Sequence, residues 1–185
     1  AEMGDMLLGP PSAVLLTRAA IIDGLGFAVK TETVMAGNTA SGLPTVQGAV
    51  LLYDSDTGAL RAAIEAKLVT EYKTAGDSVL GAQLLARPES RHLVIVGAGV
   101  MASCLARAYS AAFPLERISI WARRPEQAEA LAARLQLPGV AVAAAADLPA
   151  ALADADIVSS ATMAREPILF GDWIRPGTHV DLVGA

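Results

Sequence analysis

The chain has 185 residues, of which 54% are hydrophobic, 18% are charged and 4% are aromatic, and its formal net charge is −5. This composition excludes a disordered chain, which would combine low hydrophobicity with high net charge. The acidic balance argues against a nucleic-acid partner, because such proteins carry a basic surface. The single cysteine, Cys104, cannot form an internal disulfide, so we expect a reducing, cytoplasmic location.

Membrane and metal partners are not expected either. The long uncharged stretch 34–53 contains Asn38 and Pro44 as well as several glycines, so it favours strands and turns over a membrane span. The only histidines, His92 and His179, have no nearby set of carboxylates that could complete a metal site.

The first half of the chain is predicted to contain strands followed by one helix. Residues 27–34 and 43–53 are β-rich, residues 54–58 form a turn cluster, and residues 59–65 are the expected hairpin partner. From Thr70, a suitable N-cap, apolar residues recur at helical spacing. Because these few elements can hardly bury a core alone, we expect this half to pack against another chain or against further sequence.

Strands and helices alternate in the second half, which is typical of a parallel α/β sheet. Strands are predicted at 92–96, 117–121, 140–143, 156–160 and 178–183, and helices at 101–112, 126–135 and 148–153, with Pro125 and Asp147 at helix starts. Because the pattern changes near residues 87–90, we predict two domains. Residues 1–87 form part of a smaller α+β domain, and residues 88–185 form a Rossmann-type domain with a parallel sheet.

A glycine turn, Gly97-Ala98-Gly99-Val100-Met101-Ala102, directly follows the first strand of the second half and opens a helix. It has the G-x-G-x-x-A form of the dinucleotide fingerprint, in which the first glycine permits a tight turn and the second lets the backbone approach a pyrophosphate. The helix N-terminus then offers free N–H groups and the positive end of its dipole. These features predict a bound dinucleotide, and the alternative is a glycine turn kept for packing.

The end of the second strand of this half indicates which dinucleotide binds. An NAD site usually has Asp or Glu about 20 residues after the glycines, to accept from the ribose hydroxyl. This chain has Ala122-Arg123-Arg124 there instead. Because arginine offers phosphate a planar fork of donors, we expect NADP(H) to be preferred, with NAD(H) possible. The alternative is a solvated basic loop.

With these motifs in place, the chain resembles the ornithine cyclodeaminase/mu-crystallin family. Besides the glycine turn, the matching stretches are Gly26-Phe27-Ala28-Val29-Lys30-Thr31, Gly37-Asn38, Gly42-Leu43-Pro44-Thr45-Val46-Gln47-Gly48, Lys73-Thr74-Ala75, Arg165-Glu166-Pro167 and Pro176-Gly177-Thr178-His179-Val180. The resemblance implies a dimerising substrate domain joined to a Rossmann domain, a nicotinamide cofactor and a small imino or amino acid substrate. Residues 73–78 and 179–184 look most like the pyrroline-2-carboxylate reductase branch.

The resemblance also implies roles for single residues. Lys30 matches a lysine that contacts the substrate carboxylate, and we take it as the catalytic candidate within this chain. Lys73 stands where many members have an arginine that binds the same carboxylate, so a point charge replaces a bidentate grip. Thr45 and Thr74 match positions that line the cofactor and substrate cleft. The cofactor-binding set is completed by Gly97, Ala98, Gly99, Val100, Met101, Arg123, Arg124, Ala161 and Thr162, and the family's catalytic aspartate is expected after Ala185.

The leading prediction is an NADPH-dependent reductase of small cyclic imino acids, which converts pyrroline- or piperideine-2-carboxylate into proline or pipecolate as a homodimer. One alternative is an ornithine or lysine cyclodeaminase that uses bound NAD. The Arg123-Arg124 pair disfavours it, as does Leu7, which stands where cyclodeaminases carry a glutamate. The other alternative is a mu-crystallin-like protein that binds NADPH and a second ligand.

Overall fold

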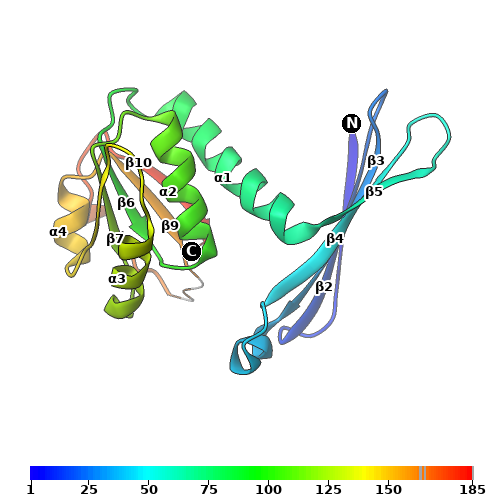
Figure 1. The fold of residues 1–185 in the computed structure, drawn as a ribbon, viewed down its shortest axis with the longest axis horizontal. Coiled ribbons are helices and arrows are strands. Elements are labelled where there is room, and N and C mark those ends of the chain that lie inside the picture. The colour runs from blue at the N-terminus through cyan, green and yellow to red at the C-terminus, as the bar shows by residue number, and fades with distance from the viewer. Residues whose placement is uncertain (163, 165, 185) are drawn as a thin grey trace. The chain divides into compact units, whose positions relative to one another are not determined.

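The computed structural model describes residues 1–162, 164 and 166–184. These residues form two compact units, Ala1–Thr70 and Glu71–Ala185, and each is described by itself. Each unit contains one five-stranded sheet (Figure 1). Helix α1, Ala66–Leu85, begins in the first unit and continues into the second.

The sheet of the first unit is an antiparallel meander, because each strand pairs with the next one along the chain. Its elements are β1 (Glu2–Leu8), β2 (Ala13–Ile22), β3 (Gly26–Met35), the short 3-10 helix η1 (Ala36–Ser41), β4 (Val46–Tyr53) and β5 (Leu60–Glu65). The strands predicted at 27–34, 43–53 and 59–65 are confirmed as β3, β4 and β5. β1 and β2 lie outside the predicted elements.

Two predicted boundaries in this unit are wrong. α1 begins at Ala66, where the residues of the first turn are good helix formers, so Thr70 lies inside the helix and is not its N-cap. The Thr70 hydroxyl instead donates to the Glu32 carboxylate at 2.9 Å. β4 begins at Val46, because Pro44 has no N–H to give to a strand ladder.

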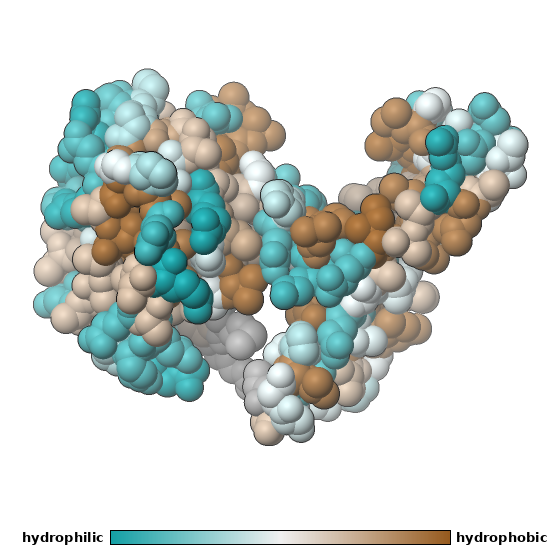
Figure 2. Space-filling view, viewed as in Figure 1, coloured by the Kyte–Doolittle hydropathy of each residue, from teal (hydrophilic) through white to brown (hydrophobic). Residues whose placement is uncertain are grey.

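The surface of the first unit is rich in apolar side chains, as Figure 2 shows for one view. Every residue of β1 is exposed, and Leu7 keeps 68% of its surface accessible. Among the described apolar residues of this unit, only Val50 and Ala66 are buried. This sheet therefore has no filled core of its own.

The sheet of the second unit is parallel throughout, with the strand order β10-β9-β6-β7-β8. Its elements are β6 (His92–Val96), α2 (Val100–Ala112), β7 (Arg117–Trp121), α3 (Pro125–Arg134), β8 (Ala141–Ala144), α4 (Leu148–Ala153), β9 (Ile157–Ala161), η2 (Gly171–Trp173) and β10 (His179–Gly184). These bounds agree with every strand and helix predicted in the second half to within one residue at each end. The Rossmann-type order, with the first strand in the middle, confirms the predicted fold class.

Helices cover both faces of this parallel sheet. Alternate residues of the central strand β6 point to opposite layers: Leu93 and Ile95 pack with residues of α1, α2 and α3, whereas Val94 and Val96 pack with residues of α4. Asp147 caps α4 by accepting a hydrogen bond from the backbone N–H three residues later, as predicted. Three layers are thus built from this unit's own residues.

The division between the compact units falls within α1 because that helix contributes to the second core. Ala75 and Ala82 are buried there, and Val79 packs against the same cluster. The functional division into residues 1–87 and 88–185 stays a prediction. No helix of the described residues, α1 included, is long and apolar enough to cross a membrane.

Candidate functional site

The glycine turn lies at the carboxyl end of β6, where the backbone geometry requires its first glycine. Gly97 has φ +126°, a conformation that L side chains rarely adopt, and its N–H donates to the Trp121 carbonyl at 2.8 Å. A Cβ at this position would lie 3.0 Å from the carbonyl carbon of Ala161 and 3.5 Å from the Thr162 methyl group. Gly97 therefore lets β6, β7 and β9 approach one another at one point.

The start of α2 provides free backbone donors beside this turn. Gly99 is the N-cap residue, and no side chain of the described residues caps the helix. A Cβ on Gly99 would meet no atom of the described residues within 4 Å, so these residues leave the space beside Gly99 open. Ala102, the third fingerprint position, is fully buried in the core under the helix. The turn thus has open space in front and tight packing behind, as a pyrophosphate site requires.

The other predicted cofactor residues lie at the same edge of the sheet. Arg123 and Arg124 follow the carboxyl end of β7 and are exposed, and the backbone of Arg124 caps α3 without a side-chain bond. Ala161 ends β9, and the N–H of Thr162 donates to the Gly184 carbonyl of β10 at 3.3 Å. Because carboxyl ends of parallel strands meet at one edge, the structure gathers the glycine turn, the arginines and the 161–162 segment there.

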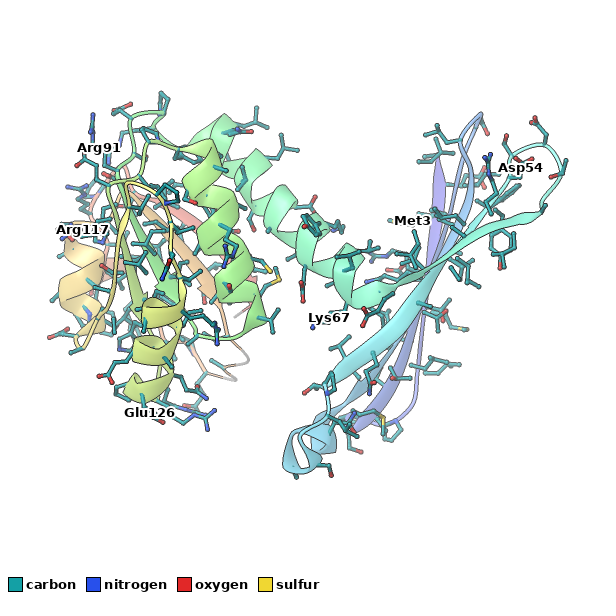
Figure 3. All side chains as sticks on the ribbon, viewed as in Figure 1. Met3, Asp54, Lys67, Arg91, Arg117 and Glu126 are labelled. Carbon is teal, nitrogen blue, oxygen red and sulfur yellow. The ribbon has the colours of Figure 1, made fainter. Side chains whose placement is uncertain are left out.

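The opposite edge of the sheet holds a different polar cluster. Figure 3 shows Arg91 and Arg117 at one end of the unit and Glu126 at the other. Asp156 accepts from the backbone N–H groups of Arg91 and His92 at 2.9 and 3.1 Å, and it pairs with Arg87 and Arg175 at 2.8 and 2.7 Å.

His92 is the buried histidine of this edge. Its Nε2 lies 2.9 Å from the Ser119 hydroxyl, and its Nδ1 lies 3.2 Å from an oxygen of Asp154. Burial and the neighbouring Arg117 charge lower the pKa of His92. These groups satisfy one another, so this edge ties the strand starts together.

A second polar network fixes β10 inside the fold. The Ser159 hydroxyl donates to Asp181 at 2.7 Å, and the buried Tyr109 hydroxyl lies 3.2 Å from the same carboxylate oxygen and 3.3 Å from the Ser78 carbonyl. Burial, reinforced by the Asp181 charge, raises the pKa of Tyr109, so it stays a neutral donor. The network links α1, α2, β9 and β10, and no sequence motif pointed to it.

In the first unit, Lys30 takes part in a compact cluster on β3. Its Nζ lies 2.6 Å from Oε2 of Glu32, and Oε1 of Glu32 accepts from Thr70 at 2.9 Å. The Glu32 side chain is almost completely buried, whereas Lys30 keeps an accessible side. The ammonium group is therefore held by the buried Glu32 carboxylate, while the Lys30 side chain stays partly exposed. Glu32 is absent from the residues expected from the sequence.

The remaining predicted substrate and cleft residues are placed as follows. Lys73 is exposed on α1 and pairs with Asp77 at 2.5 Å, one helical turn later. Thr74 is half-buried on the same helix. Thr45 is half-buried in front of β4, and its carbonyl accepts from the backbone N–H of Met35 at 2.8 Å. Their roles toward a ligand stay predictions, as do those of Lys30 and the carboxyl-edge residues. Within the described part of the chain, no group of three or more His, Cys, Asp or Glu residues could hold a metal ion.

Known proteins share this fold and sequence. The chain is 59% identical to the Delta(1)-pyrroline-2-carboxylate reductase of Paracoccus denitrificans, over 100% of this chain and 59% of the relative. The structure of the Thermococcus litoralis Delta(1)-pyrroline-2-carboxylate reductase with NADH and L-proline matches with a TM-score of 0.89 at 29% identity, over 95% of this chain and 56% of that one. A lysine cyclodeaminase structure matches with a TM-score of 0.84 at 32% identity, over 100% and 55%.

The chain thus spans between half and two thirds of the length of these proteins. The family model for ornithine cyclodeaminase/mu-crystallin proteins matches residues 20–185. This match includes β3 with Lys30, helix α1 and the whole parallel sheet with its glycine turn. The chain belongs to the ornithine cyclodeaminase/mu-crystallin family.

Proposed function

We propose that the protein is an NADPH-dependent reductase of small cyclic imino acids, with pyrroline-2-carboxylate or piperideine-2-carboxylate as substrate. The observation that carries this proposal is the 59% identity to a pyrroline-2-carboxylate reductase along the whole of this chain. Each unit by itself offers groups that suit this chemistry: the carboxyl edge of the parallel sheet suits a dinucleotide, and Lys30 suits a carboxylate. Reduction of such a substrate adds a hydride to the C=N carbon and a proton to the nitrogen.

The carboxyl edge of the parallel sheet fits a nicotinamide dinucleotide. The tight turn at Gly97, the open space at Gly99 and the uncapped start of α2 suit a pyrophosphate. When bound, the cofactor supplies the hydride, and the protein binds and orients the reactants. Ala161 and Thr162 lie against the turn, where they would limit the room beside the dinucleotide.

NADP(H) is the proposed form because of Arg123 and Arg124. Both guanidinium groups are exposed, and neither forms an ion pair with a carboxylate of the described residues. They are therefore available to a 2′-phosphate, whereas Ala122 at the strand end offers no carboxylate to a ribose hydroxyl.

The substrate carboxylate is assigned to Lys30 and Lys73. A lysine ammonium has three donors, so Lys30 can keep its bond to Glu32 and still donate to a second carboxylate. The carboxylate gives the substrate its orientation, which is the protein's main contribution to a hydride transfer. Thr45 and Thr74 complete the proposed lining of the cofactor and substrate cleft.

We also propose a homodimer in the cytoplasm. The first unit has an open groove of about 440 Å³ on its sheet, lined in part by Ile21, Phe27 and Val29. Cover by a second copy would remove this apolar surface from water. Light scattering should give twice the monomer mass, and Ile21→Lys should yield monomers. A wild-type monomer at micromolar concentration would contradict the dimer.

The proposed activity is tested by measuring cofactor oxidation with the full-length protein. NADPH should be oxidised in the presence of pyrroline-2-carboxylate or piperideine-2-carboxylate, with proline or pipecolate as product. Release of ammonia from ornithine without net cofactor turnover would identify a cyclodeaminase instead. Binding of NADPH with no turnover of any imino acid would favour a ligand-binding protein.

A further inference from the structure

We infer that Glu32 is a positioning residue of the substrate site, which holds the Lys30 ammonium group where it receives the substrate carboxylate. The inference rests on the proposed function, which assigns Lys30 to the substrate. Glu32 itself is only 5% exposed and lies behind Lys30, so it acts through the lysine and does not contact the substrate.

The position of the two residues on β3 brings them together. Lys30 and Glu32 are two residues apart on one strand, so their side chains leave the same face of the sheet. One carboxylate oxygen lies 2.6 Å from the ammonium nitrogen, and the other accepts from the Thr70 hydroxyl of α1 at 2.9 Å. With both oxygens engaged by different elements, the carboxylate has a fixed orientation, and the lysine end is fixed with it.

The neighbouring strand β4 lies close to the backbone of β3 at Glu32. Gly48 of β4 pairs in register with Glu32. A Cβ on Gly48 would collide first with the backbone carbonyl oxygen of Thr31, and it would also lie 2.8 Å from Cα and 2.9 Å from Cγ of Glu32, closer than real Cβ atoms come. Its φ is not positive, so the glycine is needed for space and not for backbone conformation. The glycine therefore allows β4 to approach the backbone of β3 closely at Thr31 and Glu32.

The charges on this face require such a partner. Arg18 of β2 pairs in register with Lys30, which places two cations side by side across the strands. Each cation has its own carboxylate: Asp5 lies 2.5 Å from Arg18, and Glu32 lies 2.6 Å from Lys30. Without Glu32, the flexible lysine stem would move away from Arg18 and would lose its orientation before substrate binds, which lowers affinity.

Glu32→Gln in the full-length enzyme tests this role, because glutamine keeps the size and the acceptor for Thr70 but removes the charge. We expect the KM for pyrroline-2-carboxylate to rise about tenfold, since a bond to a charged group is lost. We expect kcat to change far less and the Kd of NADPH to stay unaltered. Thr70→Val, which loosens the carboxylate but keeps the ion pair, should raise KM by a smaller factor.

Two controls separate positioning from a purely structural role. Arg61→Gln removes the exposed Arg61–Asp54 ion pair of the same unit, away from Lys30, and should leave KM unchanged. In a Lys30→Met background, Glu32→Gln should raise KM no further, because the effect passes through the lysine. An unchanged KM in Glu32→Gln, even with a lower Tm, would overturn the inference, and so would additive effects in the double variant.

A failure of the proposed function gives a different pattern. If wild type neither turns over an imino acid nor binds its planar analogue pyrrole-2-carboxylate in calorimetry, the proposed function fails and this role of Glu32 fails with it. If wild type does either and Glu32→Gln behaves like wild type, only the role of Glu32 is refuted.

Discussion

The two units of the molecule each contain five strands, but they bury them differently. In the second unit every residue of the central strand β6 is buried, and helices of the same chain cover both faces of the parallel sheet. In the first unit every residue of β1 is exposed, and the antiparallel meander has almost no core among its described residues. The second unit therefore has a core of its own, whereas the first unit leaves its apolar side chains uncovered.

The largest expected difference is in the free energy of unfolding, when one apolar side chain is truncated in each unit. Ile95→Ala in β6 removes a fully buried side chain and should lower the free energy of unfolding by about 2–5 kcal/mol. Leu7→Ala in β1 removes an exposed one and should cost less than about 0.5 kcal/mol in the dilute monomer.

Tryptophan fluorescence during denaturant unfolding follows the second unit alone. Both tryptophans of the chain, Trp121 and Trp173, belong to this unit and pack in its second core layer. Circular dichroism reports on both units together. Equal losses of stability from Ile95→Ala and Leu7→Ala would break the comparison, since Leu7 would then be as well packed as Ile95.

Two glycine variants of the second unit separate the stability of its fold from its affinity for a dinucleotide. Gly97→Ala forces a side chain into a positive-φ conformation against the Ala161 carbonyl, which should cost about 1–3 kcal/mol of stability as well as dinucleotide binding. Gly99→Ala meets open space, so the fold should keep its stability and lose only affinity for NADPH. Thermal unfolding combined with NADPH titration distinguishes the two effects. Equal losses of stability in both variants would show that the space at Gly99 is not open, and an unchanged affinity for NADPH in Gly99→Ala would show that it holds no dinucleotide.

The smallest predicted effect is a pH dependence of the free energy of unfolding, which comes from His92 at the start of β6. Burial and Arg117 hold the pKa of His92 below its ordinary value of 6.5. The unfolded chain therefore binds more protons than the folded one, so stability is full above about pH 6.5 and falls as the pH drops further. Burial also lowers the pKa of His179, which acts in the same direction.

Replacement of His92 by Gln should make the decrease in stability between about pH 7 and about pH 5 shallower, by less than about 1.4 kcal/mol per pH unit. Tryptophan fluorescence during urea unfolding at several pH values measures this slope. His179→Gln is the matched control and should remove a separate part of the slope. A slope that is the same in His92→Gln and wild type would contradict the assigned role of His92.

The same contrast between the units explains what the sequence could predict of the fold. Buried strands of a parallel sheet read as short continuous apolar runs, so His92–Val96 and its neighbours were predicted almost to the residue. β1 and β2 carry charged and small residues among apolar ones, because the faces of this single-layer sheet are only partly covered.

The residues of the candidate site also differ in how far the sequence predicts them. The glycine turn was predictable because one local segment holds the strand, the turn and the helix start. Glu32 was not, since its partners Thr70 and Gly48 come from other elements and meet it only in the folded sheet. The alternation of Lys30 and Glu32 on one strand face was the signal that could have found it.

The central claim, that the second unit is built to bind NADP(H), is tested most directly by calorimetric titration of the full-length protein with NADPH and with NADH. Wild type should bind NADPH at least about tenfold more tightly, because a hydrogen bond to a charged group contributes about 1.5–3 kcal/mol. The Arg123→Ala, Arg124→Ala double variant should lose this preference and keep its affinity for NADH. Equal affinity of wild type for both cofactors, or a preference that survives in the double variant, would contradict the account.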